Sequence, residues 1–376
     1  MIVGVPKEIK NHEYRVGLTP AAAKEFVAHG HKVIIETNAG ASIGFYNEDY
    51  VAAGASIIDS AEEIFATADM IVKVKEPQPN ECKMLREGQT LYTYLHLAPD
   101  PLQTELLVAS GATCIAYETV TDNFGGLPLL APMSEVAGRM SIQAGAHHLE
   151  KAQGGSGTLL GGVPGVAPAK VVVVGGGVVG TNAAKMAVGM GADVTILDRS
   201  LPRLRQLDDI FRGTVKTVYS TVDALDYYTA KADLVVGAVL IPGAAAPKLI
   251  TKEHIKNMKP GSVLVDVAID QGGCFETSRA TTHQDPTYII DDVVHYCVAN
   301  MPGGVARTST MALNNATLPF GLALANKGPV KAMLEDKHLL AGLNVHKGKV
   351  TYKAVVDALG EQLNLEYMDA VQALSL

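Results

Sequence analysis

Cysteine is scarce in this sequence of 376 residues, and the spacing of the cysteines pairs none of them. They are Cys82, Cys114, Cys274 and Cys297, and no two of them form a CxxC motif. Disulfide frameworks and zinc sites depend on such paired spacings. The sequence therefore predicts reduced thiols and argues against a fold stapled by disulfides or zinc.

Basic residues are not in excess either. The 31 Lys and Arg residues are outnumbered by 39 Asp and Glu residues, and the formal net charge is −8. A broad nucleic-acid surface needs clustered positive charge. We therefore expect no nucleic-acid partner, and small molecules or other subunits instead.

No uninterrupted hydrophobic segment indicates a membrane span. The most apolar window, residues 157–180, is long enough to cross a bilayer, but glycines, two prolines and Lys170 interrupt it. A strand followed by a glycine turn explains this window better. The opening MIVGVPKEIK holds too short an apolar run for a signal peptide. We therefore expect a cytoplasmic protein with no membrane partner.

Apolar residues are abundant enough for sizeable cores. Hydrophobic residues make up 48% of the chain and charged residues 19%, a balance typical of compact folded proteins. A chain of this length is sufficient for about two or three domains.

Residues 1 to about 125 alternate between short apolar runs and helix-like segments. The segments AAAKEFVAHG, AEEIFATA and PLQTELLVASG carry apolar residues at three- and four-residue intervals. The runs between them predict strands at residues 2–6, 32–36, 70–75, 91–97 and 113–118. Repeated strand, helix and strand indicate a parallel sheet with helices on both faces.

A second alternating unit begins at Lys170. Before it come a helix expected over residues 134–151 and a glycine-rich surface loop, GGSGTLLGGVPG. This loop is not a P-loop, because no Lys-Ser or Lys-Thr follows its glycines. The strands predicted for this unit are residues 171–175, 193–198, 215–220, 233–239, 262–268, 287–291 and 295–300.

After Pro302 the pattern becomes helical and carries no strand series of its own. We therefore expect this last stretch to pack on the first domain and make that domain discontinuous. The predicted domains are a substrate domain of residues 1–128 plus 307–376 and a dinucleotide-binding domain of residues 129–306. The predicted fold class is α/β, with two Rossmann-like, doubly wound parallel-sheet domains facing across a cleft.

A glycine motif, Gly175-x-Gly177-x-x-Gly180, directly follows four valines and opens a helix-like segment. The three glycines suit, in order, a tight turn, a close approach of backbone to pyrophosphate, and close helix-on-strand packing. The phosphates are then expected at the helix N-terminus, where unpaired N–H groups favour anions. The motif therefore predicts a dinucleotide site.

The next predicted strand ends in Asp198, eighteen residues after Gly180. A carboxylate there accepts hydrogen bonds from the ribose hydroxyls and repels a 2′-phosphate, so NAD is preferred over NADP. Arg199 is the alternative signal, because an arginine can pair with that phosphate.

Several polar residues lie at the ends of predicted strands or just after them, at the sheet edge where α/β proteins bind ligands. In the first domain they are Arg15, Lys75 and His96, and in the second Asp270 and Asn300. Such a set suits a small acid with an oxidisable carbon. Arg15 can clamp a carboxylate, Lys75 can polarise a carbonyl oxygen or add to that grip, and His96 can move a proton. From position alone, solvated cations and a packed histidine remain the alternative interpretation.

Longer blocks of the sequence resemble the L-alanine dehydrogenase family essentially from end to end. Besides the glycine motif, the blocks are VPKEIKNHEYRVGLTP, VKVKEP, YLHLAP, APMSEVAGRMS, VDVAIDQGG and VANMPGGVARTST. The resemblance implies an NAD-dependent enzyme that converts L-alanine reversibly to pyruvate and ammonium, usually as a homo-hexamer. It implies no metal here, because GLALANKG, in the region where some members hold magnesium, offers no carboxylate–histidine pair.

The resemblance also implies roles for individual residues. Arg15 and Lys75 correspond to substrate-binding residues, and His96 and Asp270 to catalytic ones. The implied NAD contacts, besides the three glycines, are Ser134, Val178, Val179, Asp198, Arg203, Ser220, Val239, Leu240, Val267, Ala268, Ile269, Asp270, Arg279, Val298, Ala299, Asn300 and Met301.

Two related activities remain as alternatives. The NAD-binding subunit of proton-translocating transhydrogenase shares the fold but lacks the pair that Lys75 and His96 form here. A saccharopine dehydrogenase would need a longer pocket and a second carboxylate clamp, and no further arginine follows a predicted strand in the first domain. Pyruvate, glyoxylate and 2-oxobutyrate all stay candidate 2-oxo acids.

Overall fold

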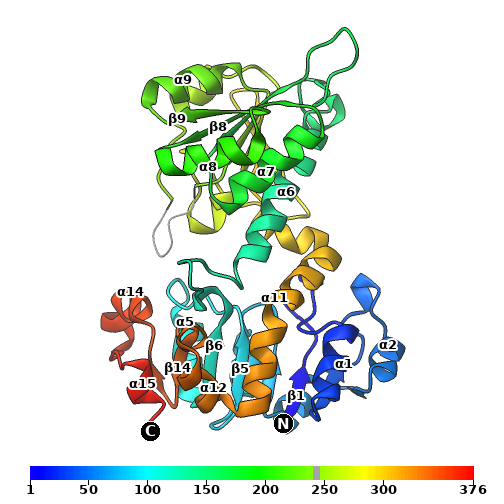
Figure 1. Ribbon diagram of the computed structural model, residues 1–376, viewed down its shortest axis with the longest axis vertical. Helices are drawn as coiled ribbons and strands as arrows, with labels where there is room; N and C mark the ends of the chain where they lie inside the picture. The colour runs from blue at the N-terminus through cyan, green and yellow to red at the C-terminus, as the bar shows by residue number, and fades with distance from the viewer. Residues whose placement is uncertain (240–245) are drawn as a thin grey trace. The chain divides into compact units, whose positions relative to one another are not determined.

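Two compact units make up the chain. The computed structural model describes residues 1–239 and 246–376. One unit comprises residues 1–132 and 306–376, and the other comprises residues 133–305. Each unit has its own β-sheet with helices packed on both faces (Figure 1).

The first unit is built on a sheet whose described strands run in the order β15-β14-β6-β5-β4-β1-β2-β3. The pairs from β6 to β3 are parallel, whereas β14 pairs with β6 and β15 with β14 in antiparallel fashion. The strands are β1 (Ile2–Val5), β2 (Lys32–Glu36), β3 (Ser56–Ile58), β4 (Met70–Val72), β5 (Thr90–Thr93), β6 (Thr113–Ala116), β14 (Leu343–His346) and β15 (Lys349–Val350).

Helices cover both faces of this sheet. They are α1 (Pro20–Ala28), α2 (Asn47–Ala52), α3 (Ala61–Thr67), α4 (Pro79–Cys82), α5 (Pro101–Ser110), α11 (Ala306–Lys327), α12 (Pro329–Glu335), α13 (Lys337–Leu340), α14 (Lys353–Leu363) and α15 (Ala370–Ala373), with 3-10 turns η1 (Ala41–Ile43) and η2 (Tyr117–Thr119). On one face Ile71 and Leu91 pack with α3, α5 and α14. On the other, Tyr92 donates to the Thr317 carbonyl of α11 at 3.1 Å. This alternation follows from the period of two residues along a strand.

The C-terminal stretch, expected to be helical and without a strand series of its own, contributes two strands to the first sheet. β14 and β15 form a hairpin on the edge of the first sheet. Lys347 and Gly348 between them have φ values of 45° and 77°, as in the two-residue turns that match the twist of antiparallel strands. The strands are short, so the flanking helical pattern hides them. β3, another short edge strand, was also absent from the predicted set.

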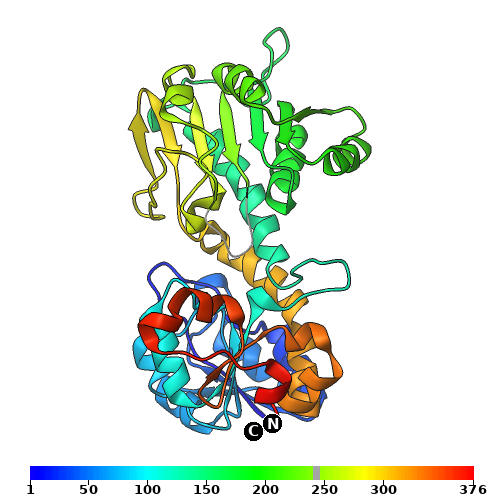
Figure 2. The same ribbon diagram turned by 90° about the vertical axis from the view of Figure 1, so that its left-hand side faces the viewer.

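The second unit is built on a sheet whose described strands run in the order β12-β13-β11-β10-β7-β8-β9. In Figure 2 they pass from the yellow strands on the left to the green strands on the right. All neighbours are parallel except β12 with β13 at one edge. The strands are β7 (Lys170–Val174), β8 (Asp193–Asp198), β9 (Val215–Tyr219), β10 (Leu234–Gly237), β11 (Val263–Asp266), β12 (Thr287–Ile290) and β13 (Val293–Tyr296).

The four valines of β7 show how this sheet is covered. Val171 and Val173 pack with α6 (Ala131–His148), α7 (Val178–Gly189) and α8 (Leu201–Phe211). Val172 and Val174 point to the opposite face, against α9 (Val222–Lys231) and α10 (Lys252–Lys256). A strand buried on both faces reads as a continuous apolar run, which explains the valines. The 3-10 turns are η3 (Lys151–Gln153), η4 (Val267–Gln271) and η5 (Met301–Val305).

Within the described ranges, no helix combines the length and the apolar character that crossing a bilayer requires.

Candidate active site

The glycine motif forms a tight turn between β7 and α7. Gly175 has a φ of 103°, a conformation that side chains other than glycine rarely adopt. A Cβ atom on Gly180 would lie 1.8 Å from the carbonyl oxygen of Gly175, so only glycine allows α7 to start this close to the turn. Gly177 is the N-cap of α7, and a Cβ atom built on it would meet nothing within 4 Å. Open space therefore adjoins the N-terminus of α7, the end of a helix where unpaired N–H groups favour an anion.

Asp198, at the end of β8, lies against this turn. Its carboxylate accepts hydrogen bonds from the backbone N–H of Gly176 at 2.7 Å and of Ser200 at 2.8 Å. Each carboxylate oxygen has two lone pairs, so ribose hydroxyls can be accepted in addition. The neighbouring Arg199, the alternative signal for NADP, is exposed.

Arg203, predicted to contact the cofactor, is bound to the glycine turn itself. Its Nε donates to the Gly176 carbonyl at 2.6 Å, and its Nη2 donates to Thr181 Oγ1 at 2.8 Å. The guanidinium therefore holds the turn in place from the side of α8.

The other predicted cofactor residues of the second unit gather mostly at the carboxyl edge of the sheet. Ser220 follows β9, Val239 follows β10, residues 267–270 form η4 after β11, and residues 298–301 follow β13. Leu240 lies outside the described residues. Ser134 and Arg279 do not follow strands: Ser134 is in the first turns of α6, and the Arg279 guanidinium lies 4.0 Å from the ring centroid of Tyr288.

Asp270 is exposed on η4, and a buried aspartate shapes that turn. Asp266, the last residue of β11, accepts hydrogen bonds from the backbone N–H of Ala268 at 3.1 Å and of Cys274 at 2.9 Å, and from the hydroxyl of Ser278. Burial raises the pKa of Asp266 above its ordinary value, although these hydrogen bonds oppose the shift. Asp266 was not among the site residues predicted from the sequence.

The three predicted site residues of the first unit follow three neighbouring strands. Arg15 lies after β1, Lys75 after β4 and His96 after β5, and these strands are adjacent in the order β5-β4-β1. Since the strands are parallel, their carboxyl ends share one edge of the sheet. The topology thus brings an arginine, a lysine and a histidine to the same edge.

Arg15 forms a bidentate ion pair with Glu13. Its Nε donates to Oε1 and its Nη2 to Oε2, each at 2.7 Å. The arginine is only 2% exposed. Burial disfavours the charged guanidinium, but the hydrogen bonds and charge of Glu13 outweigh it and raise the pKa of Arg15. The arginine is therefore a fixed, permanent cation.

Lys75 is placed by a buried cluster of charges beneath it. Glu8 accepts hydrogen bonds from the backbone N–H of Val74 at 2.6 Å and of Lys75 at 3.3 Å. The ammonium of Lys73 lies 2.8 Å from Glu8 and 3.1 Å from Glu81. Burial favours the neutral amine, but the charges of the two glutamates outweigh it and raise the pKa of Lys73.

His96 is exposed, and its backbone is strained. Its φ is 50°, in the left-handed region that few residues other than glycine adopt. Its ring lies 5.8 Å from that of Tyr94, tilted by 31°. Its backbone N–H donates to Glu118 Oε1 at 2.6 Å.

The carboxylates of Glu8, Glu13 and Glu118 were not predicted from the sequence. One of them had a signal, because Lys73 lies between Val72 and Val74 in an apolar strand, and a buried lysine needs carboxylate partners.

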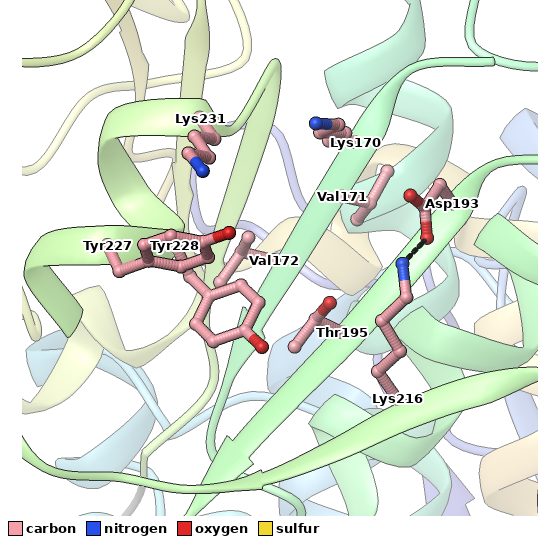
Figure 3. A pocket seen from close by; sticks show the side chains of 9 residues that line it. All are labelled: Lys170, Val171, Val172, Asp193, Thr195, Lys216, Tyr227, Tyr228 and Lys231. Atoms are coloured by element: carbon pink, nitrogen blue, oxygen red, sulfur yellow. Dashed lines mark hydrogen bonds and ion pairs between the residues drawn. The ribbon is translucent and has the colours of Figure 1, made fainter. Parts of the chain in front are cut away.

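One cavity lies elsewhere, at the amino ends of β7, β8 and β9 (Figure 3). Its volume is about 170 Å³, and it is lined by Lys170, Val171, Val172, Asp193, Thr195, Lys216, Tyr227, Tyr228 and Lys231. Lys216 pairs with Asp193 at 2.5 Å, and the Lys231 ammonium lies 3.7 Å from the ring centroid of Tyr227. The glycine turn is at the opposite end of these strands, so this cavity is not the dinucleotide site.

Comparison with known protein families identifies the family of this chain. The family described as Alanine dehydrogenase/PNT, N-terminal domain, matches residues 4–137, and the corresponding C-terminal domain matches residues 141–353. The chain belongs to the alanine dehydrogenase/PNT family.

Relatives in the alanine dehydrogenase/PNT family match over the full length. The alanine dehydrogenase of Halomonas elongata is 63% identical over 374 residues, which cover 100% of both chains. A solved L-alanine dehydrogenase superposes with a TM-score of 0.93 at 52% identity, covering 96% of this chain and 99% of the other. A transhydrogenase from Sinorhizobium meliloti, with a TM-score of 0.81 at 24% identity over 94% of this chain and all of the other, shares the fold.

Proposed function

We propose that this chain is an NAD-dependent alanine dehydrogenase that catalyses L-alanine + NAD⁺ + H₂O ⇌ pyruvate + NH₄⁺ + NADH + H⁺. Family membership and full-length identity to named alanine dehydrogenases support an amino-acid dehydrogenase. The observation that supports this reaction most strongly is the order of the strands in the first sheet. Arg15, Lys75 and His96 follow neighbouring parallel strands, so the groups that a small 2-oxo acid needs share one edge of one sheet.

The second unit fits NAD. The open space at Gly177 and the N-terminus of α7 suit the pyrophosphate, and Asp198 suits a ribose without a 2′-phosphate. The proposed contacts also include Ser134, Arg203, Arg279 and the residues after β9, β10, β11 and β13. When bound, NAD supplies the hydride acceptor. The first unit then acts as the substrate domain and the second as the cofactor domain.

In the proposed mechanism, Arg15 binds the substrate carboxylate with a guanidinium that Glu13 keeps charged and fixed. The Nε edge of the guanidinium faces Glu13, so the substrate approaches from another side. Loss of hydride from Cα of the neutral amine leaves an iminium ion on the substrate.

Water then adds to that carbon while His96 removes one of its protons. Lys75 stabilises the developing oxygen of the carbinolamine. The proton returns to nitrogen, the C–N bond breaks, and ammonia leaves with the hydroxyl proton as ammonium. Asp270 either stabilises the iminium ion or shares in these proton transfers.

We also propose that the protein works as a cytoplasmic homo-hexamer without a metal ion. The resemblance to hexameric alanine dehydrogenases supports the assembly. A solution mass corresponding to six chains is the expected result, and a monomer would contradict it.

Two substitutions test the assignment of the chemistry. His96→Ala and Asp270→Asn should each lower kcat by about 10²- to 10⁴-fold, the contribution typical of a positioned acid–base group. Binding of NADH, measured by fluorescence titration, should survive both changes. Turnover close to that of the unsubstituted enzyme in either variant would overturn the assignment.

A further inference from the structure

Glu118 lies beside His96 because of the register between β5 and β6. Thr93 pairs with Ala116 in this parallel ladder. His96 is three residues past Thr93, and Glu118 is two residues past Ala116, in η2. The two residues therefore leave the same edge of the sheet side by side, although 22 positions separate them in sequence.

The Glu118 carboxylate binds two successive backbone N–H groups. Its Oε1 accepts from His96 at 2.6 Å and from Leu95 at 3.2 Å, and its Oε2 accepts from Leu95 at 3.2 Å. Successive N–H groups converge on one anion where the chain passes through the left-handed region. His96, with its φ of 50°, provides that turn.

The carbonyl groups of the same segment are fixed by two other side chains. Gln103 Nε2 donates to the Leu95 carbonyl at 3.0 Å, and Thr104 Oγ1 donates to the Leu97 carbonyl at 3.0 Å. Both side chains are buried in α5. Glu118 supplies the charged half of this backbone clamp, and its side chain is half-buried.

Among the described residues, the His96 ring contacts Tyr94, and the hydrogen bond that His96 makes comes from its backbone N–H. The direction of the imidazole is therefore set mainly by the backbone conformation at His96. A left-handed conformation at a residue with a Cβ atom costs free energy and persists only where its surroundings impose it.

We propose that Glu118 is a positioning residue: its carboxylate holds the Leu95 and His96 amides and so keeps His96 in the left-handed conformation that aims the imidazole at the substrate. The inference rests on the proposed function, because it deepens the role of His96. Glu118 acts through His96 and does not itself touch the reacting atoms.

A double-mutant cycle tests the proposal in the full-length protein. Glu118→Ala should lower kcat by about 100-fold, the loss expected when a catalytic group is misplaced by about 1 Å. Glu118→Gln, which keeps one acceptor oxygen, should lower kcat less, and NADH affinity should be unchanged in both. In the His96→Ala background the Glu118 substitutions should change kcat by less than about 2-fold, because coupled residues are not additive.

Asp100→Ala is the matched control. Asp100 also holds a backbone N–H in this segment, that of Gln103 at 3.0 Å, at the N-cap of α5. Its loss should lower the melting temperature but leave kcat unchanged. A similar loss of kcat in this variant would show that any damage to the segment is enough, and would overturn the proposal.

A crystal structure of Glu118→Ala gives a readout independent of activity. We expect φ at His96 to leave the left-handed region. Retention of φ near 50° would overturn the proposal, as would Glu118 substitutions that leave kcat unchanged or that lower it equally with and without His96. An unsubstituted enzyme without ammonium-dependent NADH oxidation would instead refute the proposed function.

Discussion

Each side chain that we assign to the substrate is placed by a carboxylate that the chemistry itself does not use. Glu13 fixes the guanidinium of Arg15, and Glu8 binds the backbone of Lys75 above a buried lysine. Such support is what a small substrate requires, because it offers few atoms by which it can be held. These contacts explain how the substrate-binding side chains are oriented, as well as why their residue types suit the substrate.

Arg15→Lys separates the geometry of the guanidinium from its charge. Lysine keeps a positive charge beside Glu13, but it lacks the planar fork that pairs with two carboxylates at once. We expect KM for pyruvate to rise by about 10- to 100-fold, equivalent to about 1.4–2.8 kcal/mol, with a smaller effect on kcat. Steady-state kinetics measures both. An unchanged KM would contradict the carboxylate clamp.

The sequence predicts the residues of the site better than it predicts the residues that hold them in position. Arg15, Lys75 and His96 follow apolar runs and lie in recognisable blocks, so position and resemblance identify them. Glu118 becomes significant only once β5 and β6 pair in register. A pattern read along the chain contains no information about that pairing, and the support residues remain hidden for that reason.

At the scale of elements, the carboxyl ends of the parallel strands determine where function can lie. The glycine turn, Asp198 and η4 lie at the carboxyl ends of β7, β8 and β11, whereas the cavity of Figure 3 lies at the amino ends of β7, β8 and β9. A pocket at that end has no access to the N-terminus of α7, to which we assign the phosphates.

Gly180→Ala tests the packing of α7 against the glycine turn. The new Cβ would lie 1.8 Å from the Gly175 carbonyl oxygen, so the turn or the helix must move. We expect NADH binding, measured by fluorescence titration, to weaken by at least about 10-fold, or 1.4 kcal/mol.

Gly189→Ala is the control in the same helix. A Cβ there meets nothing within 4 Å, and alanine favours a helix over glycine by about 0.5–1 kcal/mol. This variant should bind NADH normally and unfold at a slightly higher temperature. Equal loss of NADH affinity in both variants would contradict the role given to Gly180.

β8 was predicted with its observed bounds, whereas β3, β14 and β15 were not predicted. β8 covers residues 193–198 as expected, because a run of apolar residues between a helix and a turn has few other interpretations. β14 and β15 are four and two residues long and lie between helices α13 and α14, whose helical pattern hides them. The Lys-Gly turn between them was the available signal.

At the scale of the whole molecule, the returning C-terminal segment completes the first sheet. α11 lies on one face of that sheet, and β14 extends its edge beyond β6. Asn314 of α11 accepts a hydrogen bond from the Thr19 backbone at 2.8 Å and donates to the Gly17 carbonyl at 3.1 Å. The first unit therefore depends on both ends of the chain.

Three buried histidines predict that acid weakens the fold. Burial is the main cause that lowers the pKa of His148, His295 and His346 below the ordinary value of 6.5. As the pH falls below about 6.5, these histidines become protonated in the unfolded chain but stay neutral in the folded protein. The free energy of unfolding therefore decreases. The free energy of unfolding stops decreasing from this cause once the pH is below the pKa values of the three histidines in the folded protein.

Urea unfolding at about pH 7.5 and about pH 5.5 measures this effect. His295→Gln should reduce the difference between the two midpoints, whereas His29→Gln, at an exposed position, should not. Unfolding midpoints that do not change with pH would contradict the prediction.

Oxidation of NADH in the presence of ammonium and a panel of 2-oxo acids is the decisive test of the proposed reaction. We expect rapid, ammonium-dependent NADH consumption with pyruvate and with other small 2-oxo acids, and formation of L-alanine from pyruvate. NADH binding without consumption, as in a nucleotide-binding subunit, or consumption only with a large dicarboxylic partner, would contradict it.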